Sequence, residues 1–120
     1  MKNPVTEPKE KGFIGYHCDL ARGAYLKPEY FKKAMARVAE SGFTHFLPYL
    51  ENMIRIPSLE KACPDCAYTA DLWVEFEHVA GDLGIELVPH FNAIGHSGQI
   101  CRAYPELAGP EGGLELDVTR

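Results

Sequence analysis

The chain of 120 residues is predicted to adopt an α/β fold built on a parallel β-sheet. Three stretches, 13–18, 44–49 and 85–91, are rich in aromatic and branched residues and are flanked by turn-forming residues, which is typical of strands. A helical pattern of apolar residues separates each strand from the next. Strands that alternate with helices of this length favour parallel pairing through right-handed crossovers.

Each predicted strand is nearly continuous in its apolar character and shows little alternation between polar and apolar residues. This pattern is typical of parallel strands that are buried on both faces. We therefore expect other elements to cover both faces of the sheet.

The two predicted helices have recognisable ends. The first carries Pro28 in its first turn and Gly42 just past its end, where these residue types are preferred. The second begins at Thr69, a residue type that caps helices, and stops at Gly84. Spacings of three and four residues predict two buried stripes, Phe31, Ala34, Met35, Val38 and Ala39 in the first helix and Leu72, Phe76, Val79, Ala80 and Leu83 in the second.

The composition predicts one domain, at 12–107, with a flexible lead-in at 1–11 and a tail at 108–120. The formal charge of −5 arises from interleaved acidic and basic residues, which argues against a nucleic-acid or anionic-membrane partner. No apolar run approaches the roughly 20 residues of a membrane span, and the lead-in lacks the apolar core of a secretory signal. A cytoplasmic location is therefore expected, with the four cysteines as thiols.

Polar residues stand just after each predicted strand, where ligands bind in parallel α/β folds. They are Asp19 and Arg22 after the first strand, Glu51 and Asn52 after the second, and His90, Asn92, His96 and Gln99 at the end of the third.

These polar residues allow more than one interpretation. Arg22 either presents its rigid fork of N–H groups to hydroxyls or a carboxylate, or forms a salt bridge with Asp19. Glu51 either orients the imidazole of His96 or is an unrelated loop residue. His90 lies in an apolar strand and is interpreted as a core or pocket-wall histidine.

The segment Cys63-Pro-Asp-Cys66 has the CxxC spacing of zinc sites and redox pairs. A zinc site needs two further ligands, for which the other cysteines and the histidines are the candidates. A single copy in a loop favours a structural or incidental role. A metal-dependent sugar isomerase, with Glu51 and His90 as metal ligands, is another alternative.

Four motifs follow one another along the chain: Asp-Leu-Ala-Arg at 19–22, Tyr-Leu-Glu-Asn at 49–52, Gly-His at 95–96 and Tyr-Pro-Glu-Leu at 104–107. In this order they resemble the strand-end motifs of family 20 glycoside hydrolases, the β-N-acetylhexosaminidases, and above all their smaller bacterial branch. The resemblance extends from residue 12 to residue 107. Periodicity alone fits a doubly wound sheet as well as a barrel, whereas the resemblance implies the first three βα units of a (β/α)8 TIM barrel. A complete barrel needs roughly 250 residues.

The resemblance also implies a carbohydrate partner with a terminal N-acetylhexosamine, no cofactor and a set of site residues. Glu51 and His96 would form a hydrogen-bonded pair that supports the catalytic acid, and Arg22 would bind the ring hydroxyls. The implied substrate-binding residues are Arg22, Asp19, His90 and Asn92.

In this family the acetamido oxygen of the substrate attacks the anomeric carbon, an Asp holds that amide, and a Glu protonates the leaving oxygen. The Asp-Glu pair follows the fourth strand, and the 120 residues contain no Asp-Glu dipeptide. The chain is thus expected to be the N-terminal portion of the hydrolase and inactive in isolation. Such a portion would leave one sheet edge and the inner face of the unclosed barrel exposed, so we expect it to self-associate through the open barrel edge. Asn52 in place of an acidic residue and the insert at 63–66 depart from the family pattern.

Overall fold

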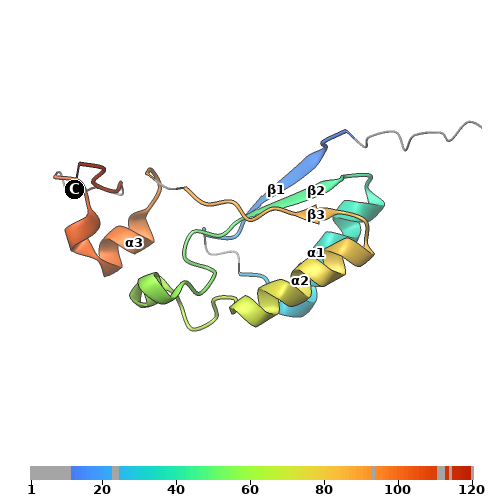
Figure 1. The fold of residues 1–120 in the computed structure, drawn as a ribbon, viewed down its shortest axis with the longest axis horizontal. Coiled ribbons are helices and arrows are strands. Elements are labelled where there is room, and N and C mark those ends of the chain that lie inside the picture. The colour runs from blue at the N-terminus through green and yellow to red at the C-terminus, as the bar shows by residue number, and fades with distance from the viewer. Residues whose placement is uncertain (1–11, 23–24, 93, 111–112, 114, 120) are drawn as a thin grey trace, which may run out of the picture.

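The computed structural model describes residues 12–22, 25–92, 94–110, 113 and 115–119, so the predicted lead-in lies outside the described residues. Three parallel strands, β1 (Gly15–Asp19), β2 (His45–Tyr49) and β3 (Glu86–Leu87), form one sheet in the order β1-β2-β3. Two long helices, α1 (Pro28–Glu40) and α2 (Ala70–Asp82), connect the strands and lie together on one side of the sheet (Figure 1). The predicted β-α-β-α-β order and the parallel pairing are confirmed.

The long helices begin and end as predicted. The Thr69 side chain accepts a hydrogen bond from the backbone N–H of Leu72 at 3.2 Å, which caps α2. The first helix has Pro28 at its start and no side-chain cap from Lys27. Gly42 and Gly84 follow the two helices with φ of 84° and 70°, a conformation that glycine adopts without a Cβ clash.

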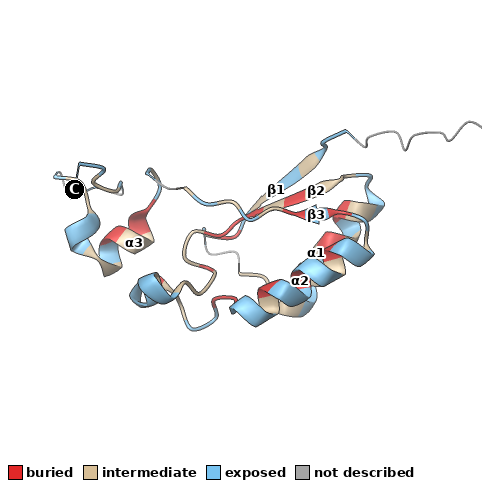
Figure 2. Cartoon of the chain, viewed as in Figure 1, coloured by how far each residue is buried: buried red, intermediate tan, exposed pale blue. Residues whose placement is uncertain are grey.

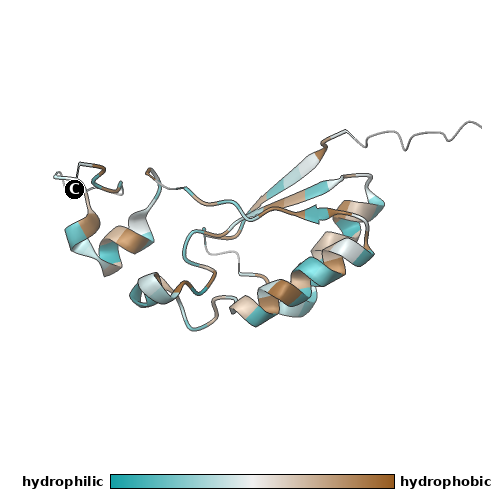
Figure 3. Cartoon of the chain, in the orientation of Figure 1, coloured by the Kyte–Doolittle hydropathy of each residue, from teal (hydrophilic) through white to brown (hydrophobic). Residues whose placement is uncertain are grey.

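The core lies between the helix layer and the sheet, and it is rich in aromatic rings. Phe31 of α1 stacks on Phe76 of α2 with ring centroids 4.2 Å apart, and it also contacts Phe46 of β2. Figure 2 shows the buried residues of both helices along the side that faces the sheet, and Figure 3 shows polar residues along the outer side. Lys32 and Glu75 form an ion pair that links the two helices at the surface.

The third strand is shorter than predicted, and the cause is a proline in its neighbour. Val88 donates its N–H to the carbonyl of Phe46 at 2.8 Å, and His90 donates to the carbonyl of Pro48 at 3.0 Å. Leu50 donates back to His90 at 3.1 Å, so alternate residues of β2 present their N–H groups to this side. Pro48 has no N–H to present. The ladder is therefore interrupted after β3 and resumes as a single bridge between Tyr49 and His90.

The expectation that both faces of the sheet are covered is wrong for the described residues. The helices cover one face only, and β1 forms an edge beside which Phe13, Ile14 and Tyr16 are 66 %, 56 % and 45 % exposed. The helix-free face instead carries polar rings and a carboxylate. Its side chains include His17, His45, Tyr49, Glu86 and His90.

Beyond the sheet, three short helical segments lie on the side of the carboxyl ends of the strands. They are η1 (Pro57–Ala62), α3 (Gly98–Ala103) and η2 (Pro105–Leu107). The Tyr104 hydroxyl accepts a hydrogen bond from the Lys61 N–H at 3.2 Å, which joins the segment after α3 to η1. Within the part of the chain that the structure describes, no helix is long and apolar enough to cross a membrane.

Candidate functional site

The carboxyl ends of the three strands meet at one edge of the sheet. Leu20, just after β1, donates its N–H to Tyr49 at 3.0 Å, and Leu50, just after β2, donates to His90 at 3.1 Å. These bonds extend the strand register by one residue, so that the loops after β1, β2 and β3 leave the sheet side by side. Residues that are far apart in the sequence are thereby brought to the same rim.

A pocket of about 230 Å³ lies at this rim. Arg22 lines it from the loop after β1, Glu51 from the loop after β2, and His96 from the loop before α3. Gln99 and Arg102 complete the wall from α3. The structure therefore brings together the three residues on which the sequence-based site depends.

Glu51 and His96 share an unusual backbone conformation. Their φ angles are 44° and 56°, and they are the only non-glycine residues with positive φ in the part of the chain that the structure describes. Such conformations cost about 1–3 kcal/mol each and persist where the surrounding structure enforces them, often at functional sites. Their occurrence at two walls of one pocket marks this pocket as a candidate functional site.

The Glu51 carboxylate connects the end of β2 to α3. Its Oε1 accepts a hydrogen bond from the backbone N–H of Gln99, in the first turn of α3, at 3.2 Å. The structure describes both Glu51 and His96 and shows no hydrogen bond between their side chains. Their role as a supporting pair stays a prediction, and in this conformation Glu51 holds the wall of the pocket.

Arg22 fits both of its interpretations. Its Nε lies 3.6 Å from Oδ2 of Asp19, so the predicted salt bridge is present, and the other carboxylate oxygen of Asp19 accepts the N–H of Ala21 at 2.9 Å. The Arg22 and Asp19 side chains are 56 % and 40 % exposed. An ion pair that is this exposed contributes little to the stability of the fold, because solvent screens it. Arg22 is therefore positioned by Asp19 and remains accessible to a ligand.

Tyr49 lies among the predicted residues, although the sequence predicted no role for it. It is only 4 % exposed, and its hydroxyl donates to the carbonyl of His96 at 3.4 Å. The Asn92 side chain lies beside the same hydroxyl. Burial raises the pKa of Tyr49, and the nearby Glu51 carboxylate acts in the same direction, while Arg22 opposes it.

His90 does not lie in the 230 Å³ pocket but on the adjoining helix-free face. Its Nδ1 lies 3.0 Å from Nε2 of His17, a hydrogen bond that passes over β2, and its ring centroid is 5.2 Å from that of Tyr49. His90 is half-buried, as the pocket-wall interpretation requires. His17 was missed because it lies inside β1, whereas the candidate residues were sought at the ends of the strands.

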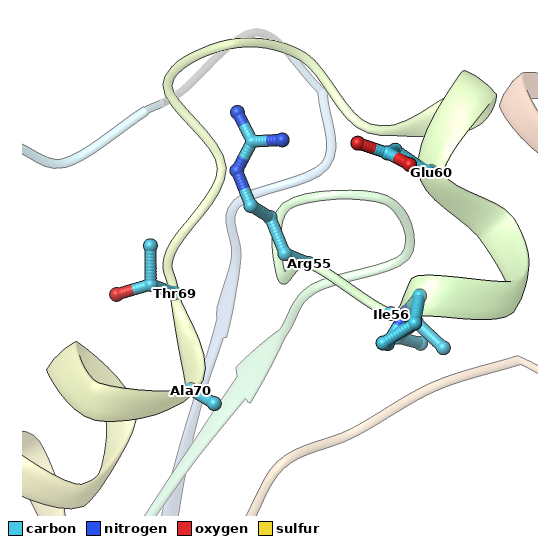
Figure 4. A pocket seen from close by; sticks show the side chains of 6 residues that line it. Arg55, Ile56, Glu60, Thr69 and Ala70 are labelled. Atoms are coloured by element: carbon cyan, nitrogen blue, oxygen red, sulfur yellow. The ribbon is translucent and has the colours of Figure 1, made fainter.

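A second pocket, of about 340 Å³, lies between η1 and the start of α2. Arg55 projects into it between Thr69 and Glu60, with Ile56 and Ala70 at its base (Figure 4). The Arg55 guanidinium donates to the carbonyl of Asp65 at 3.0 Å, so it holds the loop before α2. None of the residues predicted for the site lines this pocket, and its lining contains neither of the two strained residues.

The CxxC segment behaves as part of a loop. The Sγ of Cys63 lies 3.4 Å from the carbonyl oxygens of both Ile54 and Leu59, so its single S–H has two acceptors within reach, and Cys66 is exposed. The described residues bring no three of His, Cys, Asp and Glu close enough to hold a metal ion. The zinc and isomerase alternatives therefore gain no support from the arrangement of donors.

Several solved structures resemble this one. The β-hexosaminidase of Streptomyces plicatus, solved with its product GlcNAc, superposes with a TM-score of 0.79 at 19% identity, over 92% of this chain and 27% of its own. The family 20 β-N-acetylhexosaminidase of Streptomyces coelicolor gives 0.77 at 18% identity, over 88% and 26% of the two chains. The chitobiase of Flavobacterium johnsoniae gives 0.70 at 23% identity, over 79% and 16%.

The chain has the fold of the part of these family 20 enzymes on which it superposes. The predicted resemblance is thus confirmed at the level of the fold. The chain spans about a quarter of the Streptomyces enzymes and 16% of the chitobiase. No family model and no curated protein matches the sequence.

Proposed function

We propose that this chain is the opening part of the catalytic barrel of a β-N-acetylhexosaminidase-type glycoside hydrolase, and that it forms part of the pocket for a terminal N-acetylhexosamine. The proposal rests on one observation above all: Arg22, Glu51 and His96 line a common pocket at the carboxyl ends of parallel strands. The fold shared with family 20 enzymes supports it. The domain bounds, the cytoplasmic location and the barrel itself stay predictions.

Within the proposed pocket each residue has a chemical task. The Arg22 guanidinium presents several N–H donors in one plane, which suits paired ring hydroxyls. Glu51 holds α3 against the strand ends, and the imidazole of His96 lines the same pocket as a donor or acceptor. Tyr49 supports this wall from below through the carbonyl of His96.

The chemistry of bond cleavage would fall to residues outside these. By the family resemblance, the sugar's own acetamido oxygen is the nucleophile, and an Asp-Glu pair polarises the amide and protonates the leaving oxygen. No Asp-Glu dipeptide occurs in the 120 residues. We therefore propose that the chain binds the sugar and does not hydrolyse its glycosides.

Calorimetric titration of the 120-residue chain with GlcNAc, and with glucose as the sugar that lacks the acetamido group, tests the proposal. We expect weak binding of GlcNAc that Arg22→Gln reduces by about tenfold, the equivalent of one lost charge-assisted hydrogen bond of about 1.4 kcal/mol. Arg37→Gln, an exposed arginine on α1 outside this pocket, is the matched control and should bind as the unchanged chain does.

Two results would count against the proposed function. One is a GlcNAc affinity that Arg22→Gln and Arg37→Gln alter equally. The other is release of 4-nitrophenol from its N-acetylglucosaminide by the purified chain, because the proposal assigns the catalytic acid to residues that these 120 do not include.

A further inference from the structure

The α3 wall of the pocket carries an arginine that no motif predicts. Arg102 stands in the last turn of α3, is exposed, and lines the pocket together with Arg22. Arg102 forms no ion pair with any residue that the structure describes. The pocket thus has one guanidinium on the β1 side and a second on the α3 side.

The charge of this pocket is opposite in sign to the net charge of the chain. The chain has a formal charge of −5, yet the described lining holds two arginines and a single carboxylate. That carboxylate, Glu51, already accepts the N–H of Gln99. Asp19 balances Arg22 only through an exposed contact of 3.6 Å, which a better acceptor would displace at little cost.

Guanidinium groups bind carboxylate, sulfate and phosphate with paired, charge-assisted hydrogen bonds. Two arginines that line the same pocket, one from the loop after β1 and one from α3, therefore suit an anionic group.

We propose that Arg102 acts with Arg22 to make this pocket selective for an N-acetylhexosamine that bears an anionic group. The inference rests on the proposed function and specifies its substrate class. Arg22 would hold the sugar ring, and Arg102, from α3, would contact the phosphate, sulfate or carboxylate. The substituent is identified by its negative charge, which is the property that the second guanidinium recognises.

The test compares three probes on the 120-residue chain by calorimetric titration: GlcNAc 6-phosphate, GlcNAc and inorganic phosphate. We expect GlcNAc 6-phosphate to bind at least about tenfold more tightly than either of the others, a margin of about 1.4 kcal/mol. Arg102→Gln should remove that margin. Arg37→Gln, in the last turn of α1, is the matched control and should keep the margin.

The outcomes separate this inference from the function on which it rests. Equal affinity for GlcNAc and its 6-phosphate, with both dependent on Arg22, would overturn the inference and keep the proposed function. Equal affinity for GlcNAc 6-phosphate and inorganic phosphate would also overturn it, because the site would then be a simple anion site. Circular dichroism of each variant verifies that it is folded, and Arg102→Lys should restore part of the margin.

Discussion

At the scale of single residues, the strained backbone at Glu51 and His96 is the feature that sets the pocket apart from the rest of the chain. The side chain of His96 is exposed, so its conformation is not explained by packing of that side chain. Energy stored there destabilises the fold, which is expected where a residue is retained for its chemistry.

Replacing His96 with glycine should therefore remove strain. We expect the free energy of unfolding to stay unchanged or rise by up to about 1 kcal/mol, because glycine adopts positive φ freely and offsets part of this gain through its larger unfolded-state entropy. Sugar binding should be lost at the same time. His78→Gly, the same change at an exposed site inside α2, should lower the free energy of unfolding by roughly 0.5 kcal/mol. Urea denaturation of both variants measures the difference, and a loss of stability in His96→Gly would refute the strain argument.

The raised pKa of Tyr68 predicts how the stability of the fold depends on pH. Its hydroxyl donates to the carbonyl of Leu26 at 2.6 Å, and burial raises the pKa of Tyr68 above its usual value of 10.0. Below that value both the folded and the unfolded chain keep the proton, and the full stability is present. Above it the unfolded chain ionises first, so the free energy of unfolding falls as the pH rises toward the folded-state pKa.

Denaturation at pH 8 and pH 11 measures this fall, which Tyr68→Phe should reduce. Tyr30→Phe, at an exposed site on α1, is the control and should show the same fall as the unchanged chain. An identical pH dependence in all three proteins would exclude Tyr68 as its source.

At the scale of helices and strands, the sequence predicted most of the architecture because the signals were local. Pro28, Thr69 and the glycines at 42 and 84 act within one turn of the helices that they bound. The shortened β3 was not predicted, because it results from Pro48 in a different strand. The strand pattern did not predict the uncovered second face, since apolar strands look alike whether or not a partner covers them. Only the resemblance to part of a barrel implied it.

The two long helices differ in their N-terminal caps, and this difference predicts stability changes of opposite sign. Thr69→Ala removes the cap of α2 and should lower the free energy of unfolding by about 1 kcal/mol, whereas Thr69→Ser should change it little. Lys27→Ser adds a side-chain cap to α1, where none is present. It should raise the free energy of unfolding by several tenths of a kcal/mol to about 1 kcal/mol. Thermal denaturation measures both. A stabilising Thr69→Ala or a destabilising Lys27→Ser would contradict the assigned helix starts.

The site was predictable to the extent that it depends on strand order. Arg22, Glu51 and His96 follow strands whose carboxyl ends meet, so their convergence follows from parallel pairing. Arg102 was not predictable, because the direction of α3 depends on the tertiary contact between Glu51 and Gln99. Tyr49 was overlooked as an ordinary strand residue, although it directly precedes the Glu51 loop.

At the scale of the whole molecule, the exposed edge of β1 predicts self-association. Phe13, Ile14 and Tyr16 lie on or beside this edge, whose unpaired backbone groups can bind a further strand. We expect the apparent mass in analytical ultracentrifugation to rise with concentration. Ile14→Lys should shift the chain toward the monomer, while Val74→Lys, a similarly exposed apolar site on α2, should not. A chain that remains monomeric at every concentration would contradict this prediction.

The central claim concerns the pocket at the strand ends, and residue-resolved NMR during titration with GlcNAc tests it most directly. The account predicts amide shift changes that concentrate at Arg22, Glu51, His96 and Gln99 and that leave Arg55 and Glu60 of the second pocket unaffected. Shift changes centred on Arg55 and Glu60, or none at any of these residues at saturating sugar, would contradict it.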